Sequence, residues 1–157
     1  MTPLQLTERL ALYVRERPGD RDHPLILWAL ELCGLPEAHD ETPWCGALLM
    51  LVAVLCGLTR PARPARARSW LTVGQPIALA DAVPGYDVVV LSRGIEPQPG
   101  PDVLDAPGHI GLFVRRVGPD LPDPEVFIRG GNQSNRITVE GFASRRVLGV
   151  RRLGEAA

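Results

Sequence analysis

Residues 42–57 of the 157-residue chain read T-P-W-C-G-A-L-L-M-L-V-A-V-L-C-G. The threonine is a favourable helix N-cap, and a proline directly after it suits the first helical position. Gly57 supplies the left-handed residue with which many helices end. Because the positions in between are apolar on nearly every side, this stretch is predicted to form a central, buried helix.

Cys45 is the residue of this helix best placed for chemistry. Counted from a cap at Thr42, it is the third helical residue, where backbone N–H groups have no partner within the helix. Those groups and the helix dipole stabilise a thiolate, so a lowered thiol pKa and a nucleophilic role are expected. Cys33 and Cys56 fall late in apolar helices and are interpreted as small buried hydrophobic residues.

The rest of the chain predicts helices first and strands afterwards. A capping-box pattern at residues 2–5 starts a helix that should stop at the Pro-Gly pair at 18–19, and a second helix is expected from residue 24 to Gly34. Short β-branched or alternating runs then follow, at residues 88–91, 110–114, 125–128, 136–140 and 147–151.

These patterns predict one α+β domain over residues 1–157. The N-terminal helices, with the Cys45 helix at their centre, would pack on a C-terminal antiparallel sheet of about five strands. Residues 92–108 form a long connection for so small a domain, and such loops are often functional.

Composition excludes several classes of protein. A net charge of −1, from 17 basic and 18 acidic side chains, predicts no nucleic-acid partner. The most apolar stretch, residues 47–58, is shorter than the roughly 20 residues that span a membrane. Three cysteines without C-x-x-C spacing argue against a disulfide framework and a zinc finger. The N-terminus lacks a signal-peptide pattern, so synthesis in the cytoplasm is expected.

Two polar positions on the predicted strands complement Cys45. His109 opens an apolar strand between Gly108 and Gly111, and an imidazole can accept a thiol proton and return it to a leaving amine. Asn132 follows two glycines, and its amide oxygen could orient that imidazole. On local grounds alone, the run around Asn132 is more typical of a turn.

The order of five motifs resembles a bacterial and phage family of small NlpC-type and CHAP-like cell-wall hydrolases. The resemblance covers roughly residues 23–152. The motifs are D-E-T-P-W-C-G at 40–46, A-R-S-W-L-T-V-G at 67–74, P-G-Y-D-V-V-V at 84–90, G-H-I-G-L-F at 108–113 and G-G-N-Q-S-N at 130–135.

This resemblance implies a papain-like fold and a cysteine amidase or endopeptidase that cleaves the stem peptide or cross-bridge of peptidoglycan. Cys45 would be the nucleophile, His109 the general base and acid, and Asn132 the residue that orients His109. We expect a monomer that needs no cofactor or metal. It would reach the cell wall after lysis-assisted release, as an endolysin, or by injection as an antibacterial effector with a cognate immunity protein.

Four further residues are expected to bind the substrate. Trp44 and Trp70 would form apolar walls of a groove, Gly131 would leave room for a peptide backbone, and Arg68 would bind a carboxylate. Core packing is the competing interpretation for both tryptophans.

Two other functions remain open at this stage. The chain could be a catalytically inactive wall-binding or phage-structural member of the same fold. It could also be a metalloprotein with Cys45, His109 and an acidic residue such as Asp87 as ligands, which the spacing of these residues makes the weaker hypothesis.

Overall fold

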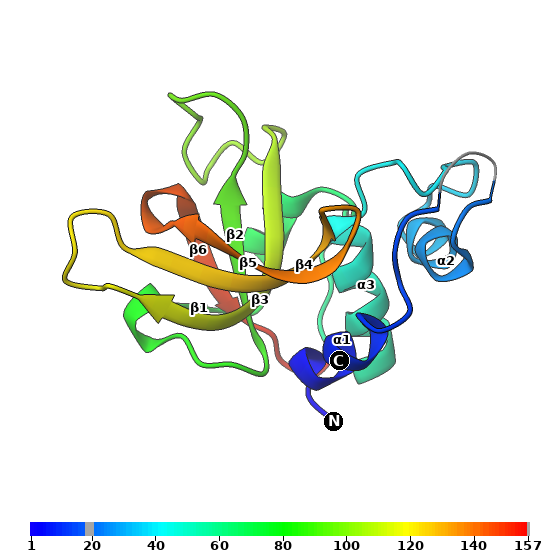
Figure 1. Ribbon diagram of the computed structural model, residues 1–157, viewed down its shortest axis with the longest axis horizontal. Helices are drawn as coiled ribbons and strands as arrows, with labels where there is room; N and C mark the ends of the chain where they lie inside the picture. Colours follow the sequence, from blue (N-terminus) through cyan, green and yellow to red (C-terminus); the bar gives the residue numbers. More distant parts are fainter. Residues whose placement is uncertain (18–20, 157) are drawn as a thin grey trace.

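The computed structural model describes residues 1–17 and 21–156, and within them helices pack against a six-stranded antiparallel sheet (Figure 1). The predicted α+β class is confirmed. The helix α3 lies between the sheet and α2, as Figure 1 shows, which agrees with its apolar surface.

The helices are α1 (Pro3–Leu10), α2 (Pro24–Leu32) and α3 (Cys45–Cys56). The capping box at the start of α1 is confirmed, with Thr2 accepting from Gln5 N–H and the Gln5 side chain accepting from Thr2 N–H. Helix α1 ends earlier than predicted because the chain turns into a β-bridge between Arg15 and Arg136. The predicted stop at 18–19 lies outside the described residues.

Helix α3 begins later than its sequence predicts. Trp44, not Thr42, is the N-cap residue, so Cys45 is the first helical residue instead of the third. The Trp44 indole is buried and donates to Glu16 Oε1 at 2.9 Å, and this long-range contact holds the residue outside the helix. Gly57 ends the helix in the left-handed conformation, as predicted.

The strands follow the order β1-β6-β2-β3-β4-β5. All five predicted runs are confirmed as strands. The sixth strand, β1, is a three-residue edge strand that contains Pro76, which is why its sequence reads as a loop. The strands are β1 (Gln75–Ile77), β2 (Asp87–Ser92), β3 (Gly108–Val117), β4 (Glu125–Gln133), β5 (Arg136–Ala143) and β6 (Val147–Arg152).

Both faces of the central strands β2 and β3 are buried. Side chains alternate between the faces of a strand, so Val88, Val90, Ile110 and Leu112 pack with α3 in one apolar cluster. Val89, Leu91 and Phe113 belong to a second cluster on the other face, with residues of β4 and β6. The apolar area buried here anchors α3 to the sheet and fixes the position of its first turn.

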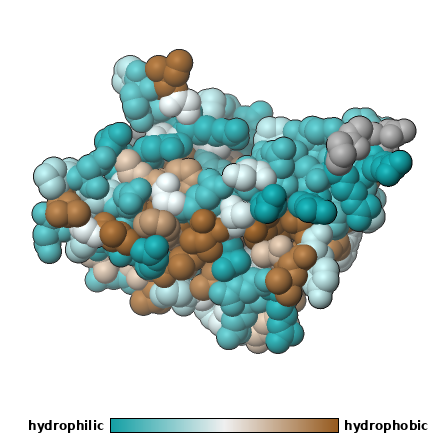
Figure 2. All heavy atoms as spheres, in the orientation of Figure 1, coloured by the Kyte–Doolittle hydropathy of each residue, from teal (hydrophilic) through white to brown (hydrophobic). Residues whose placement is uncertain are grey.

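One face of the molecule is more polar over α2 than over α1 and the sheet. Figure 2 shows hydrophilic side chains covering the α2 end of this face, whereas apolar side chains gather over the sheet and α1. None of the described helices has the length and apolar character needed to cross a membrane.

The entry to α3 meets β4 at Gly131. A Cβ atom at this position would lie 2.4 Å from the Trp44 ring. We expect Gly131→Ala to lower the free energy of unfolding by about 1–3 kcal/mol, the usual cost of overpacking, as measured by urea denaturation.

Gly154→Ala is the matched control, because an added Cβ there meets nothing within 4 Å. Equal stability of the two variants would contradict the close Trp44–Gly131 contact.

Candidate functional site

The first element of the site is the thiol of Cys45, in the first turn of α3. The residue is 5% exposed and packs in the same cluster as Ile110 of β3. The backbone N–H groups of Gly46 and Ile110 and the charge of Arg93 favour the thiolate, but burial outweighs them and raises the pKa of Cys45. The predicted lowering of this pKa is therefore wrong, because the loss of solvent exceeds the stabilisation by helix N–H groups.

The second element is His109, at the start of β3. Its ring lies 5.5 Å from the Phe142 ring, and its Nε2 lies 2.9 Å from Gln133 Oε1. Burial lowers the pKa of His109, while the hydrogen bond to Gln133 opposes this shift. A neutral imidazole is thus favoured at neutral pH.

Gln133 determines which nitrogen of His109 carries the proton. Its Nε2 donates to the carbonyl oxygen of Thr138 at 2.9 Å, so its Oε1 faces the imidazole and must accept. Nε2 of His109 is then the protonated nitrogen, and Nδ1 has a free lone pair. The site therefore holds a neutral base in a defined tautomer.

The hydrogen bond predicted for Asn132 is made by Gln133 instead. The β4–β5 register shifts between Gly130 and Gln133, and Asn132 has a positive φ of 56° within this irregularity. Asn132 still lines the same small hollow as His109. The adjacent amide in G-G-N-Q was the available signal, but a bulge alters the side-chain alternation and cannot be located from the sequence.

The thiol and the imidazole approach the start of β3 from two faces. His109 pairs with Leu91, which belongs to the cluster on the face away from Cys45. Within the described residues the two side chains form no hydrogen bond with each other; the ring bonds to Gln133. The expected direct contact between nucleophile and base is therefore not formed in this conformation.

Cys45 and His109 line two different hollows, and Arg93 lines both of them. Cys45 lines a hollow of about 510 Å³ together with residues of the connections before β3, and His109 lines one of about 160 Å³. Arg93 follows β2, lines both hollows and takes part in no ion pair among the described residues. Sequence analysis missed this residue, because an arginine after a strand has no distinctive pattern.

The four predicted substrate-binding residues are part of the interior instead. Trp44 and Trp70 are 1% and 0% exposed, and Trp70 donates to the carbonyl of Pro64 at 2.9 Å. The space that a side chain at position 131 would need is filled by the Trp44 ring and Leu48, so Gly131 leaves no room for a peptide backbone. These predictions are corrected: aromatic side chains of this size are buried because the core between α3 and the sheet requires their volume.

Arg68 is also 0% exposed and cannot meet a substrate. Its guanidinium donates to backbone carbonyls of the connection between β2 and β3, at distances of 2.8–3.3 Å; the acceptors are Pro99, Gly100, Val103 and Pro107. This corrects its predicted role. Arg68 anchors the connection whose residues 104–107 line the Cys45 hollow.

Asp87 is unsuited to the metal-binding alternative. Both of its oxygens accept from Arg152 at 2.7 Å, and it also accepts from Val83 N–H. It opens β2, whereas His109 pairs with Leu91 at the opposite end of that strand. The proposed set of Cys45, His109 and Asp87 is therefore not assembled.

No family model matches this chain, and no curated protein or solved structure matches it. The chemistry available at the site follows from its residues. They comprise a buried thiol beside N–H donors, a neutral imidazole with a fixed tautomer, and one cation between them.

The raised pKa of Cys45 predicts how this thiol reacts. Below a raised pKa, the thiolate fraction grows about tenfold per pH unit, so alkylation by iodoacetamide should accelerate steadily from pH 7 to pH 9. The rate at Cys45 is measured by mass spectrometry of its peptide, with circular dichroism confirming the fold at each pH. A rate independent of pH over this range would indicate a preformed thiolate and contradict the assignment.

Proposed function

We propose that the protein is a papain-like cysteine amidase or endopeptidase that cleaves an amide bond in the stem peptide or cross-bridge of peptidoglycan. The observation that best supports this function is the His109–Gln133 hydrogen bond. It provides a neutral base at the strand position directly before Ile110, whose N–H faces the Cys45 thiol. With Nε2 fixed as the donor, the imidazole keeps Nδ1 able to accept the proton of a nucleophilic thiol.

Catalysis starts from two neutral groups, because burial disfavours both the thiolate and the imidazolium. Nδ1 of His109 takes the thiol proton while Sγ of Cys45 attacks the carbonyl carbon, forming a tetrahedral intermediate. The backbone N–H of Cys45, which has no partner within the helix because Cys45 is the first helical residue, and the Arg93 guanidinium stabilise the oxyanion. Collapse breaks the C–N bond, and the protonated imidazole gives its proton to the amine. Water then hydrolyses the thioester with the same base.

This mechanism requires the thiol and imidazole to approach each other when a peptide is bound. Catalytic hydrogen bonds are often long or unformed without substrate and tighten in the Michaelis complex. Cys45 and His109 each line one of the two hollows that Arg93 also lines, so a substrate that fills both hollows would contact both groups.

The two arginines that line the larger hollow, which Cys45 also lines, suit a peptide that carries carboxylates, as stem peptides do. Arg66 and Arg93 both line this hollow. Arg66 already pairs with Asp105, so Arg93 is the cation available to a substrate carboxylate. We propose that the enzyme reaches the wall after lysis-assisted release or by injection, and an injected form would have an immunity protein as its partner.

A second candidate is a wall-binding protein of the same fold without turnover. Cys45 is nearly inaccessible and forms no hydrogen bond with His109, and both observations favour this alternative. The two functions differ in whether new chain ends appear in the cell wall.

Digestion of purified sacculi distinguishes the two functions. We expect the protein to release muropeptides with new N-termini, identified by mass spectrometry, and Cys45→Ser to reduce release to background because the nucleophile is lost. Cys33→Ala and Cys56→Ala are the controls and should retain activity. Binding to sacculi without release by the unmodified protein would favour the non-catalytic alternative.

We expect Gln133 to contribute more to catalysis than Asn132. We expect Gln133→Ala to lower kcat by about 10- to 100-fold, since the imidazole loses its tautomer and orientation, and Asn132→Ala to lower it far less.

The pH profile of kcat/KM shows whether Gln133 positions the imidazole of His109 or only stabilises the fold. The Gln133 hydrogen bond raises the pKa of His109, so its loss should move the acid limb of kcat/KM to lower pH. An unchanged profile, or a larger loss in Asn132→Ala, would contradict the assigned role.

A further inference from the structure

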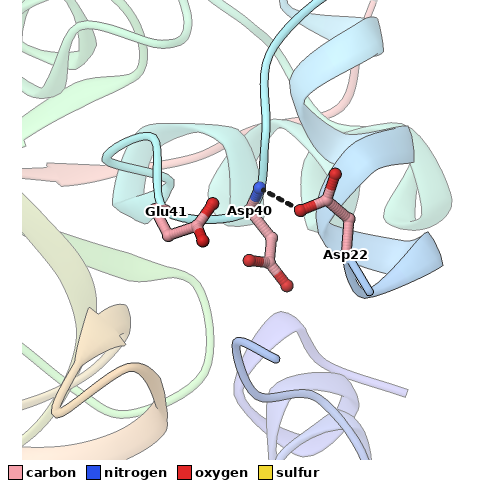
Figure 3. A group of neighbouring side chains, drawn as sticks. All are labelled: Asp22, Asp40 and Glu41. Atoms are coloured by element: carbon pink, nitrogen blue, oxygen red, sulfur yellow. Dashed lines mark hydrogen bonds between the residues drawn. The ribbon is translucent and has the colours of Figure 1, made fainter. Parts of the chain in front are cut away.

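Three carboxylates gather where the segments that enter α2 and α3 meet, and none of them lines either hollow of the candidate active site. Asp22 precedes α2, whereas Asp40 and Glu41 precede α3 (Figure 3). One oxygen from each carboxylate lies within 4.8 Å of the others. That span matches the oxygens around one Ca²⁺ ion, whose ligands lie about 2.4 Å from the metal and hence at most about twice that distance apart.

Asp40 provides an independent indication of a ligand. The residue is 0% exposed, and its Oδ2 accepts from the N–H groups of Arg17 and His23 at 3.0 and 2.8 Å. Its Oδ1 is buried and has no partner among the described residues. Figure 3 shows one Asp40 oxygen turned toward the Glu41 carboxylate. An unpartnered buried carboxylate oxygen is costly unless a cation or water satisfies it.

The surrounding charges also favour a bound cation. Asp22 accepts from Asp40 N–H at 3.2 Å through Oδ1, and its Oδ2 lies 2.8 Å from Nδ1 of the exposed His39. No arginine of the described chain forms an ion pair with these three carboxylates. Three negatively charged carboxylates therefore lie together, and the one imidazole paired with them among the described residues is that of His39.

We propose that Asp22, Asp40 and Glu41 bind one Ca²⁺ ion. The donors are carboxylate oxygens only, which select a hard cation over zinc or copper. Glu41 is exposed, so water can complete a shell of six to eight ligands, and Ca²⁺ tolerates such irregular geometry better than Mg²⁺. The ion would join the entry of α2 to the entry of α3. This site is separate from the proposed hydrolytic function.

The test is calorimetric titration of CaCl₂ into the full-length protein after removal of metals with EDTA. We expect one equivalent to bind and the thermal midpoint to rise with Ca²⁺. Glu41→Gln leaves the fold intact because the side chain is exposed, and it should weaken binding by about tenfold or more. Asp40→Asn should abolish binding. Asp123→Asn, an exposed carboxylate paired with Arg145, is the matched control and should bind like the unmodified protein.

Three results would overturn the proposal. The first is the absence of binding heat and of a midpoint shift at about 10 mM Ca²⁺, above the range of weak extracellular sites. The second is equal affinity of Glu41→Gln and the unmodified protein, which would show non-specific association. The third is tighter binding of Mg²⁺ than of Ca²⁺. If Asp40→Asn fails to fold, Glu41→Gln decides alone.

Discussion

The packing of α3 on the sheet, chiefly on β3 and β4, is the constraint on which the other features depend. One face of α3 shares an apolar cluster with Val88, Val90, Ile110 and Leu112, so the helix cannot slide without opening the core. This contact brings the first turn of α3 to the start of β3. It thereby determines both the position of Cys45 and the burial that raises its pKa.

The same burial affects both halves of the proposed dyad in a consistent way. Removing solvent favours the neutral thiol and the neutral imidazole, so the resting state of each of these two side chains is uncharged. Gln133 then supplies through a neutral amide the orientation that a carboxylate would otherwise give. An amide adds no negative charge to a site whose neighbours include Arg93 and Arg146.

Local patterns in the sequence were sufficient to predict most elements of the fold, but not the edge strand β1 and not the contacts between elements. The five strands and the central helix follow from periodicity, and the caps at Thr2 and Gly57 follow from local residue preferences. The start of α3 depends on a hydrogen bond between Trp44 and Glu16, which are distant in the sequence. The partner of His109 likewise depends on a bulge in β4. Both are tertiary effects that no local pattern contains.

The hydrogen bonds of Arg68 have a consequence for how the lining of the Cys45 hollow can change. Its guanidinium holds the connection before β3 through main-chain carbonyl oxygens, which every amino acid possesses. Side chains such as Leu104 and Asp105 can therefore be exchanged without loss of the anchor, although they line the Cys45 hollow. The main chain of this connection is therefore held in place independently of its side chains. Selection can change the side chains that line the hollow while the path of the main chain stays the same.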